Sequence, residues 1–443
     1  MNEPTIFWVR YVENVGIVVH GRLLTDKPYI AEQATLNGIP LKLSEKRILP
    51  TGKCRDDVQM WDLPEGTPDG EHVIEIITRT GNVSAKFTIN RVVEESDFTE
   101  VAPGEYLVTK GRLKDKKIEG KLTVKGEGVV LENVHIVNKE FNAPALLMWG
   151  CSDLFCYDCY FRADRPIDGM QHKFSPRVTF SRCEMESWGT QRGAPGRFLG
   201  EDGAMLFCTG HNMNRSLTLA GRQGPLKNLL IYGNSFFDLG RSDWRNESDG
   251  MCLESVGDAV QGTSLGNVIV LDPKTCGKLD SEPHNVYAPG FIVVHKESET
   301  YAIIKKIGMR TDSQLWIELE TPLPKLPQGT TFYIGSSFLN MTIARNHING
   351  GRFGVTLWGV FYGLHLIDNL IDNCTVPVQE LVRARPEHPG CNLKMVTRDN
   401  LIFNHALDMV NQKDRLNYGD APIWTTPGGY DFAKLDPQKF VKF

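Results

Sequence analysis

The sequence predicts an all-β protein: a right-handed parallel β-helix with an N-terminal β-sandwich and a small β-barrel inserted between coils. A short unit of residues recurs at the length of one coil from about Lys117 to Asp408, and this repeat predicts the β-helix. Two stretches outside the repeat alternate apolar and polar residues, as antiparallel strands do. The expected domains are a sandwich at 1–95, the first coils at 96–262, a barrel at 263–337, and the final coils with a tail at 338–443.

The N-terminal region contains short alternating strands separated by Pro and Gly turns. Residues 72–78 (HVIEIIT) and 84–90 (SAKFTIN) form such a pair around Gly81. Hairpins of this kind are typical of a small β-sandwich. The domain resembles the immunoglobulin-like modules that precede catalytic domains in many carbohydrate-active proteins. We expect it to pack as a cap over the first coil of the solenoid.

The repeated unit is an apolar residue, two positions, a small or amide residue, one position, and another apolar residue. Its middle residues are Val134, Asp158, Cys183, Asn234, Asn346, Asn369 and, approximately, Asn400. The steps from 134 to 158 and from 158 to 183 are 24 and 25 residues, and the step from 346 to 369 is 23. Because coils stack about 4.8 Å apart, like positions form ladders along the solenoid axis.

Four of these middle residues are asparagines, expected in one tight turn where their amides satisfy backbone groups. This pattern resembles the asparagine-ladder turn of pectate-lyase-like proteins. The resemblance implies a parallel β-helix with a long side face that binds an extended polymer such as a polysaccharide. It is specific for the fold, and it does not by itself identify an activity.

Two departures from even spacing point to added segments. The interval from Cys183 to Asn234 is interpreted as one coil carrying two long loops, Ser187 to Gly200 and Gly210 to Lys227. Long loops on a rigid scaffold often carry function. The stretch from Thr263 to Ser337 alternates as antiparallel strands and predicts a barrel or sandwich inserted between coils.

A recurring Asp-Gly pair supplies the candidate catalytic acids. It occurs at Asp168, Asp202 and Asp249, each time before an apolar strand. If these copies are equivalent in successive coils, neighbouring carboxylates lie roughly 5 Å apart. Two carboxyl groups at this separation have different pKa values, so one can donate a proton while the other stays ionised. Asp202, Asp249 and the nearby Glu254 are therefore the predicted catalytic residues, although Asp-Gly is also an ordinary turn.

Strand alternation predicts which residues face the substrate. With Met170, Ala204, Met251 and Val355 inside, the outward row contains Lys173, Phe207, Glu254 and Trp358. Tryptophan can stack on sugar rings, and arginine can grip a carboxylate, although each tryptophan can equally be core. The predicted substrate-binding residues are Lys173, Arg197, His211, Arg241, Trp244, Arg245 and Trp358.

Three functional hypotheses follow. The first is a glycoside hydrolase that uses paired carboxylates, as the resemblance to polygalacturonase-like hydrolases also implies, and it needs no cofactor. The second is a polysaccharide lyase or uronate epimerase, in which Lys173, His211 or an arginine removes a proton and the aspartates hold Ca²⁺. The third is a non-catalytic, tailspike-like glycan-binding protein.

Composition narrows the classes of partner and of site. The net charge is -5 and the basic residues are scattered, so a nucleic-acid partner is not expected. No apolar run reaches the ~18 residues of a membrane span, so a soluble protein is expected; its compartment stays open, with a secreted or periplasmic location as one alternative. Cys151, Cys156 and Cys159 lack the second ligand pair of a zinc site, so they are predicted to be core thiols rather than metal ligands.

Overall fold

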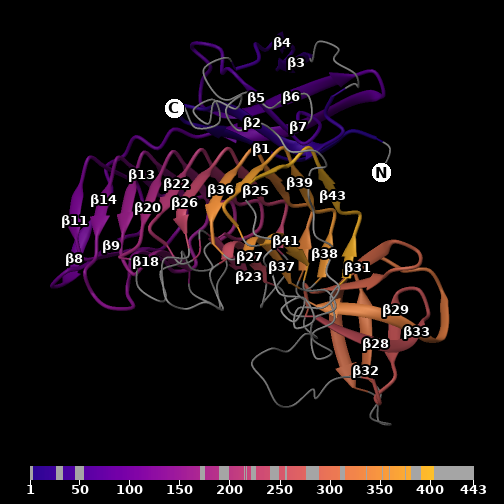
Figure 1. Cartoon of the computed structure of the whole chain (residues 1–443). Coiled ribbons are helices and arrows are strands. Elements are labelled where there is room, and N and C mark those ends of the chain that lie inside the picture. Colours follow the sequence, from indigo (N-terminus) through magenta and orange to yellow (C-terminus); the bar gives the residue numbers. More distant parts are fainter. Residues whose placement is uncertain are drawn as a thin grey trace.

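The computed structural model confirms the predicted fold class, and its described residues form strands without any helix (Figure 1). None of these elements is a helix that could cross a membrane. The structure describes residues 3–25, 33–44, 54–169, 175–188, 199–213, 215, 217–220, 226–239, 249–254, 257–275, 289–309, 315–335, 337–351, 353–358, 360–374, 376–380 and 391–403.

The N-terminal domain is a sandwich of two antiparallel sheets. One contains β1 (Thr5–Val12), β2 (Gly16–Arg22) and β5 (Val58–Trp61), and the other contains β3 (Gln33–Leu36), β4 (Ile39–Pro40), β6 (Gly70–Thr78) and β7 (Gly81–Ile89). The predicted strand pair is the hairpin β6–β7, which turns between Thr78 and Gly81. Ile17, Trp61 and Ile74 are buried between the sheets. The resemblance of the N-terminal domain to immunoglobulin-like modules remains a prediction.

Two nine-stranded parallel sheets run the length of the solenoid. Sheet 1 contains β10 (Arg112–Lys114), β13 (Val130–Glu132), β16 (Phe155–Tyr157), β19 (Thr179–Ser181), β21 (Ala204–Leu206), β25 (Leu230–Tyr232), β35 (Thr342–Ala344), β39 (His365–Ile367) and β43 (Val396–Arg398). Sheet 2 contains β11 (Lys117–Glu119), β14 (His135–Val137), β17 (Tyr160–Arg162), β20 (Glu184–Glu186), β22 (Thr209–His211), β26 (Ser235–Leu239), β36 (His347–Gly350), β40 (Leu370–Asp372) and β44 (Leu401–Phe403).

Shorter sheets complete the coils. Sheet 3a contains β8 (Thr99–Ala102), β9 (Glu105–Val108), β12 (Lys121–Val124), β15 (Pro144–Met148) and β18 (Arg165–Gly169). In later coils its place is taken by sheet 3b, with β23 (Leu217–Ala220), β27 (Asp249–Glu254), β37 (Phe353–Trp358) and β41 (Val376–Glu380). Sheet 4 contains β24 (Leu226–Lys227), β34 (Ser337–Leu339), β38 (Val360–Tyr362) and β42 (Cys391–Leu393), and leads back into sheet 1.

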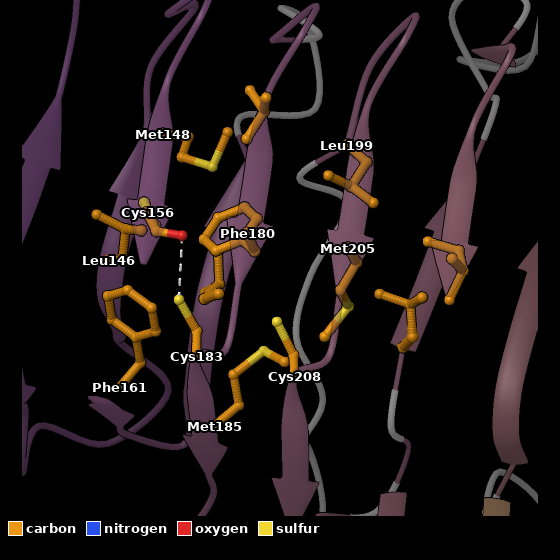
Figure 2. Packing of buried hydrophobic residues seen from close by; sticks show 14 of the residues in the cluster. Leu146, Met148, Cys156, Phe161, Phe180, Cys183, Met185, Leu199, Met205 and Cys208 are labelled. Atoms are coloured by element: carbon orange, nitrogen blue, oxygen red, sulfur yellow. Dashed lines mark hydrogen bonds between the residues drawn. The ribbon is translucent and has the colours of Figure 1, made fainter. Parts of the chain in front are cut away.

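The predicted asparagine ladder lies in the tight turn between sheets 1 and 2. Asn346 Nδ2 donates to the carbonyl oxygen of Ile231 at 2.9 Å and to Asn369 Oδ1 at 3.0 Å. In earlier coils cysteines occupy this place: Cys159 Sγ donates to Leu131 O, and Cys183 Sγ donates to Cys156 O, each at 3.3 Å (Figure 2). Cysteine thiols and asparagine amides therefore donate hydrogen bonds to the same row of backbone carbonyl oxygens.

Two details of the predicted repeat are wrong. Asp158 is not a ladder residue, because it has the positive φ of the turn, 57°, and Cys159 follows it in the ladder. The interval from Cys183 to Asn234 holds two coils rather than one, since β21 and β22 form a complete coil step around Cys208. The second predicted loop, Gly210 to Lys227, therefore contains strand residues of β22, β23 and β24.

A continuous apolar core fills the coils. Met148, Phe161 and Phe180 pack within it beside the cysteines (Figure 2). Cys151, Cys156 and Cys159 are buried free thiols, as predicted. Within the described ranges, no three His, Cys, Asp or Glu side chains are grouped to hold a metal ion.

The insertion is a closed six-stranded barrel. It contains β28 (Gly257–Ser264), β29 (Val268–Leu271), β30 (Ile292–His295), β31 (Thr300–Met309), β32 (Leu315–Leu319) and β33 (Leu326–Gly335), so it begins before the expected boundary at 263. Ile292 and Val294 of β30 pack against Val360 and Tyr362 of sheet 4. The barrel is thereby fixed beside the last coils (Figure 1).

The sandwich packs along the outer face of sheet 1 rather than over the end of the first coil (Figure 1). Val18 and Met60 contact a row that includes Leu206, Tyr232 and Ala344. Polar contacts reinforce this interface: Arg22 donates to Thr342 Oγ1 at 2.7 Å and to the carbonyl oxygen of Gly363 at 2.8 Å. One long face of the solenoid is therefore covered.

Candidate active site

The predicted pairing of Asp202 with Asp249 is wrong. Asp202 lies directly before β21 of sheet 1, whereas Asp249 is the first residue of β27 in sheet 3b. Asp168 lies in β18 of sheet 3a, which corresponds to sheet 3b in the earlier coils, whereas Asp202 and Gly203 lie in the turn before sheet 1. The dipeptide marks both a turn and a strand start, and the sequence does not distinguish these two settings.

Asp202 is a turn residue at the edge of the sandwich. Its φ is 56°, and Asn228 Nδ2 donates to its Oδ1 at 2.9 Å. Arg10 of the sandwich donates to its carbonyl oxygen at 2.9 Å. These contacts give Asp202 a structural role in the turn, and none of them indicates a catalytic role.

The predicted alternation holds for sheet 3b and fails for sheet 1. Met251 and Val355 are in the solenoid core, as expected. Ala204 instead faces the sandwich, while its neighbour Met205 fills the core. Phe207 is buried against Tyr232, so it is not part of an exposed sugar platform.

Several predicted site residues lie outside the described residues. These are Lys173, Arg197, Arg241, Trp244 and Arg245. The backbone of Glu254 is placed in register with that of Trp358 on the neighbouring strand β37.

His211 is the predicted site residue that the structure brings together with other polar side chains. It lies on β22 of sheet 2, and its Nε2 is 2.8 Å from Glu184 Oε1 on β20. The ring of Phe237 stacks on its imidazole, with centroids 5.2 Å apart and planes 8° apart. Stacking and the hydrogen bond together fix the orientation of the imidazole.

A second carboxylate, Glu186, lies on the same strand and is held by donors. Tyr160 Oη donates to its Oε2 at 2.5 Å, and Asn212 Nδ2 donates to its Oε1 at 3.3 Å. Arg162 lies 3.4 Å from Oε1. The side chain of Glu186 is 14% exposed and that of Glu184 is 50% exposed, so the two acids differ in environment.

Tyr160 is a hydrogen-bond donor rather than a base. Burial raises the pKa of its phenol, and the adjacent Glu186 carboxylate raises it further. The phenol therefore stays protonated near neutral pH and its proton points to Glu186.

Arg162 contacts both Glu186 and the ring of Trp188, and Glu184 lines a recess. The Trp188 indole donates to the carbonyl oxygen of Asn138 at 2.9 Å, and the Arg162 guanidinium lies 3.8 Å from its ring centroid. The recess, of about 420 Å³, is lined by His135, Asp158, Cys159, Tyr160, Arg182 and Glu184. Polar groups thus surround an open surface on sheet 2.

The sequence contained a signal for this site. Glu184 and Glu186 flank Met185, which is buried in the core, so alternation along one short strand sends both glutamates outward. Residues two positions apart on a strand are separated by about 6.6 Å. Inverting glycosidases hold their two carboxyl groups ~6.5 to 9.5 Å apart, a separation that side chains on backbone positions so spaced can reach.

No model of a known protein family matches the chain, and no curated protein matches it. One similar solved structure is the catalytic unit of a thermostable GH87 alpha-1,3-glucanase from Streptomyces thermodiastaticus. The two chains share 10% sequence identity with a TM-score of 0.26, and the match covers 90% of this chain and 88% of that chain. A similarity of this size assigns no activity, which has to come from the side chains of the site.

Proposed function

We propose that the protein is a polysaccharide-active glycoside hydrolase whose acid and base are Glu184 and Glu186. The observation that carries the proposal is the unequal setting of two outward carboxylates on one strand. Glu186 accepts hydrogen bonds from Tyr160 and Asn212, whereas Glu184 is more exposed and lies against His211. Glycosidic hydrolysis needs this division between an ionised carboxylate and a proton donor.

Each group then has a defined task. Glu186 accepts a proton from the attacking water. The proton held between Glu184 and His211 passes to the glycosidic oxygen as the bond to the leaving sugar breaks. Tyr160 and Asn212 position Glu186, and Phe237 positions His211.

The substrate is proposed to lie across the strands of sheet 2. Like positions recur there at about 4.8 Å from coil to coil, which gives an extended chain repeated contacts. Phe237, 37% exposed, and Trp188 provide rings beside the acids for stacking on sugars.

The first test measures new reducing ends on a panel of neutral and acidic polysaccharides. Glu186→Gln and Glu184→Gln should each lower turnover by about 10² or more, because neither amide can exchange a proton. Glu318→Gln is the matched control, since this glutamate pairs with Lys305 on the barrel. Turnover should not change with a chelator, because the mechanism uses no metal.

The alternatives give different results in the same assay. If Asp249→Asn or Glu254→Gln abolishes turnover while the variants of Glu184 and Glu186 keep wild-type rates, the acids lie on β27. Ultraviolet absorbance of an unsaturated uronate in the products would identify a lyase. Binding without any turnover across the panel would identify a glycan-binding protein and reject the hydrolase proposal.

A further inference from the structure

A groove separates the sandwich from the first coils of the solenoid. Its volume is about 600 Å³, and it lies between strands β1 and β7 and the first strands of sheet 1. In later coils the same two surfaces are in contact through Val18, Leu206 and Tyr232. The groove therefore forms where the sandwich and sheet 1 diverge, and its volume is in the range of small-molecule sites.

One wall is a connected set of polar side chains around Glu13. Arg112 donates to Glu13 Oε2 at 2.8 Å and to Glu132 Oε2 at 2.6 Å. Tyr157 Oη donates to the same Glu13 oxygen at 2.6 Å. Burial and this carboxylate raise the pKa of Tyr157, so its hydroxyl remains a donor. The wall is held in place before any ligand arrives.

Two further arginines that line the groove are held by hydrogen bonds. Arg177 donates to both carboxylate oxygens of Asp153, at 2.7 and 2.6 Å. Arg10 is buried, donates to Thr179 Oγ1 at 2.5 Å, and lies over the ring of Phe155 with its Cζ 5.9 Å from the centroid. Planar, immobilised groups of this type have little rotamer freedom left to lose on binding.

The charges around the groove are balanced. The lining cations are Arg10, Lys86, Arg112 and Arg177. The lining carboxylates are Glu13, Glu127, Asp153 and Asp202. The four cations already have acidic or carbonyl partners, so the groove has no excess positive charge for an anionic ligand. Paired charged groups still offer free lone pairs and N–H groups to hydroxyls.

We propose that this groove binds a short, uncharged oligosaccharide at a site separate from sheet 2. Hydroxyl groups match its paired donors and acceptors, and the rings of Phe7, Tyr11 and Phe155 supply apolar surface for sugar rings. A second site on the same solenoid holds a long glycan at two points and raises its effective concentration at sheet 2. Binding in the groove does not require that sheet 2 catalyses hydrolysis.

The test blocks the groove from its rim. Thr88 is an exposed groove residue on β7, and Ser84 is exposed on the same strand but does not line the groove. Thr88→Trp should therefore fill the site, whereas Ser84→Trp is the matched control. Both are made in the full chain that also carries Glu186→Gln, so that no probe is cleaved. Calorimetry then measures binding of maltohexaose, cellohexaose, laminarihexaose and hexagalacturonate.

The expected result is binding of at least one neutral probe that Thr88→Trp weakens by about tenfold or more and Ser84→Trp leaves unchanged. Tyr157→Phe, which removes only the hydroxyl bonded to Glu13, should weaken the same probe. Equal affinity in Thr88→Trp and Ser84→Trp, a preference for hexagalacturonate, or no binding of any neutral probe would overturn the proposal. All of these variants carry Glu186→Gln and the readout is binding alone, so the outcome does not depend on whether sheet 2 catalyses hydrolysis.

Discussion

At the scale of single residues, an asparagine of the ladder turn makes several hydrogen bonds with one side chain, although the repeat shows only that an amide recurs there. Asn346 is buried and bonds to Ile231 O, Ala344 O and Asn369 Oδ1, while its own Oδ1 accepts from Asn234. The amide of Asn346 has two donor hydrogens and an acceptor oxygen, so it donates toward both neighbouring coils and accepts from one of them. The ladder therefore links coils through side chains as well as through strands.

Replacing Asn346 with alanine should lower the free energy of unfolding by about 3 kcal/mol, because several buried partners lose their hydrogen bonds at once. Urea denaturation followed by circular dichroism measures the change. Asn82→Ala is the control, since Asn82 is exposed on β7 and its amide donates to Glu75 Oε1 at 3.1 Å on the surface. Equal urea midpoints for the two variants would contradict the ladder's role.

The changeover from cysteine to asparagine permits a stabilising substitution. The Cys208 backbone N–H already donates to Asn234 Oδ1 at 2.8 Å, as a ladder member does. Cys208→Asn adds an amide that can reach the carbonyl row of the previous coil, and should stabilise the fold by about 1 kcal/mol. The variant Cys208→Ala gains no amide, so it should be no more stable than the wild type. A lower urea midpoint for Cys208→Asn than for Cys208→Ala would show that a ladder position held by cysteine cannot accept asparagine.

The residue pattern predicted the coils wherever the unit was complete, and it missed the coil of Cys208 for a steric reason. Gly210 stands where the unit requires an apolar residue. A Cβ at Gly210 would lie 2.5 Å from Met213 Cε and 2.8 Å from Phe236 Cδ1, so those neighbours already fill the space. The core is complete there, but the apolar residue that completes it comes from elsewhere in the sequence.

At the scale of elements, the interface between the sandwich and sheet 1 contains buried titratable groups. His20 is fully buried, with Nε2 2.9 Å from Thr342 Oγ1, and burial together with Arg22 holds its pKa well below 6.5. Burial also lowers the pKa of His365, whose Nδ1 lies 2.6 Å from Asp57 Oδ2. Burial raises the pKa of Asp57, but Arg22 and His365 lower it more, so it lies below its ordinary value.

These shifts predict a loss of stability on acidification. An unfolded chain binds protons at its histidines near pH 6.5, whereas folded His20 and His365 resist protonation, so stability falls as the pH drops below about 6.5. The depressed pKa of Asp57 adds a further loss at lower pH. His20→Gln should reduce the decrease between pH 7.5 and 5.5 by about 1 kcal/mol. If urea titrations give the same change of unfolding free energy with pH for the variant and the wild type, His20 does not contribute to this loss of stability.

The sequence could not predict this interface, or the site on sheet 2, from local pattern. His20 and Thr342 are far apart in the chain, and nothing near either residue indicates the other. The glutamates of β20 were detectable by alternation, but Tyr160 counted as an apolar member of the repeat. Its phenol has a partner only because β17 and β20 are neighbours in sheet 2.

At the scale of the whole molecule, the barrel is a separable part. Gly257 and Gly335 are register partners, so the chain enters and leaves the barrel at adjacent strand ends. Across the insertion β25 pairs directly with β35, and β26 with β36. The architecture was predictable from the broken repeat, whereas the packing of the barrel on sheet 4 was not, because it depends on Tyr301 meeting Tyr362.

Replacing residues 257–335 with a short Gly-Ser linker should leave the coils folded but uncover Leu339, Val360 and Tyr362. We expect unchanged cooperative unfolding of the solenoid and a larger assembly than the wild type on size-exclusion chromatography with light scattering. Adding Tyr362→Lys to the shortened chain should reverse that association. Loss of β-strand circular dichroism in the shortened chain would mean that the coils depend on the barrel.

The pairing of β25 with β35 also sets an order of events during synthesis. When the ribosome has completed β25 and β26, their outer edges have no partner strand and the Asn234 amide is bonded only to the preceding coil, because Asn346 lies 112 residues beyond Asn234 in the chain. Unpaired parallel edges are templates for pairing with other chains. Until the barrel and β35 emerge, the growing half-solenoid ends in a bare edge, and a slow stretch of translation in this interval would prolong its exposure.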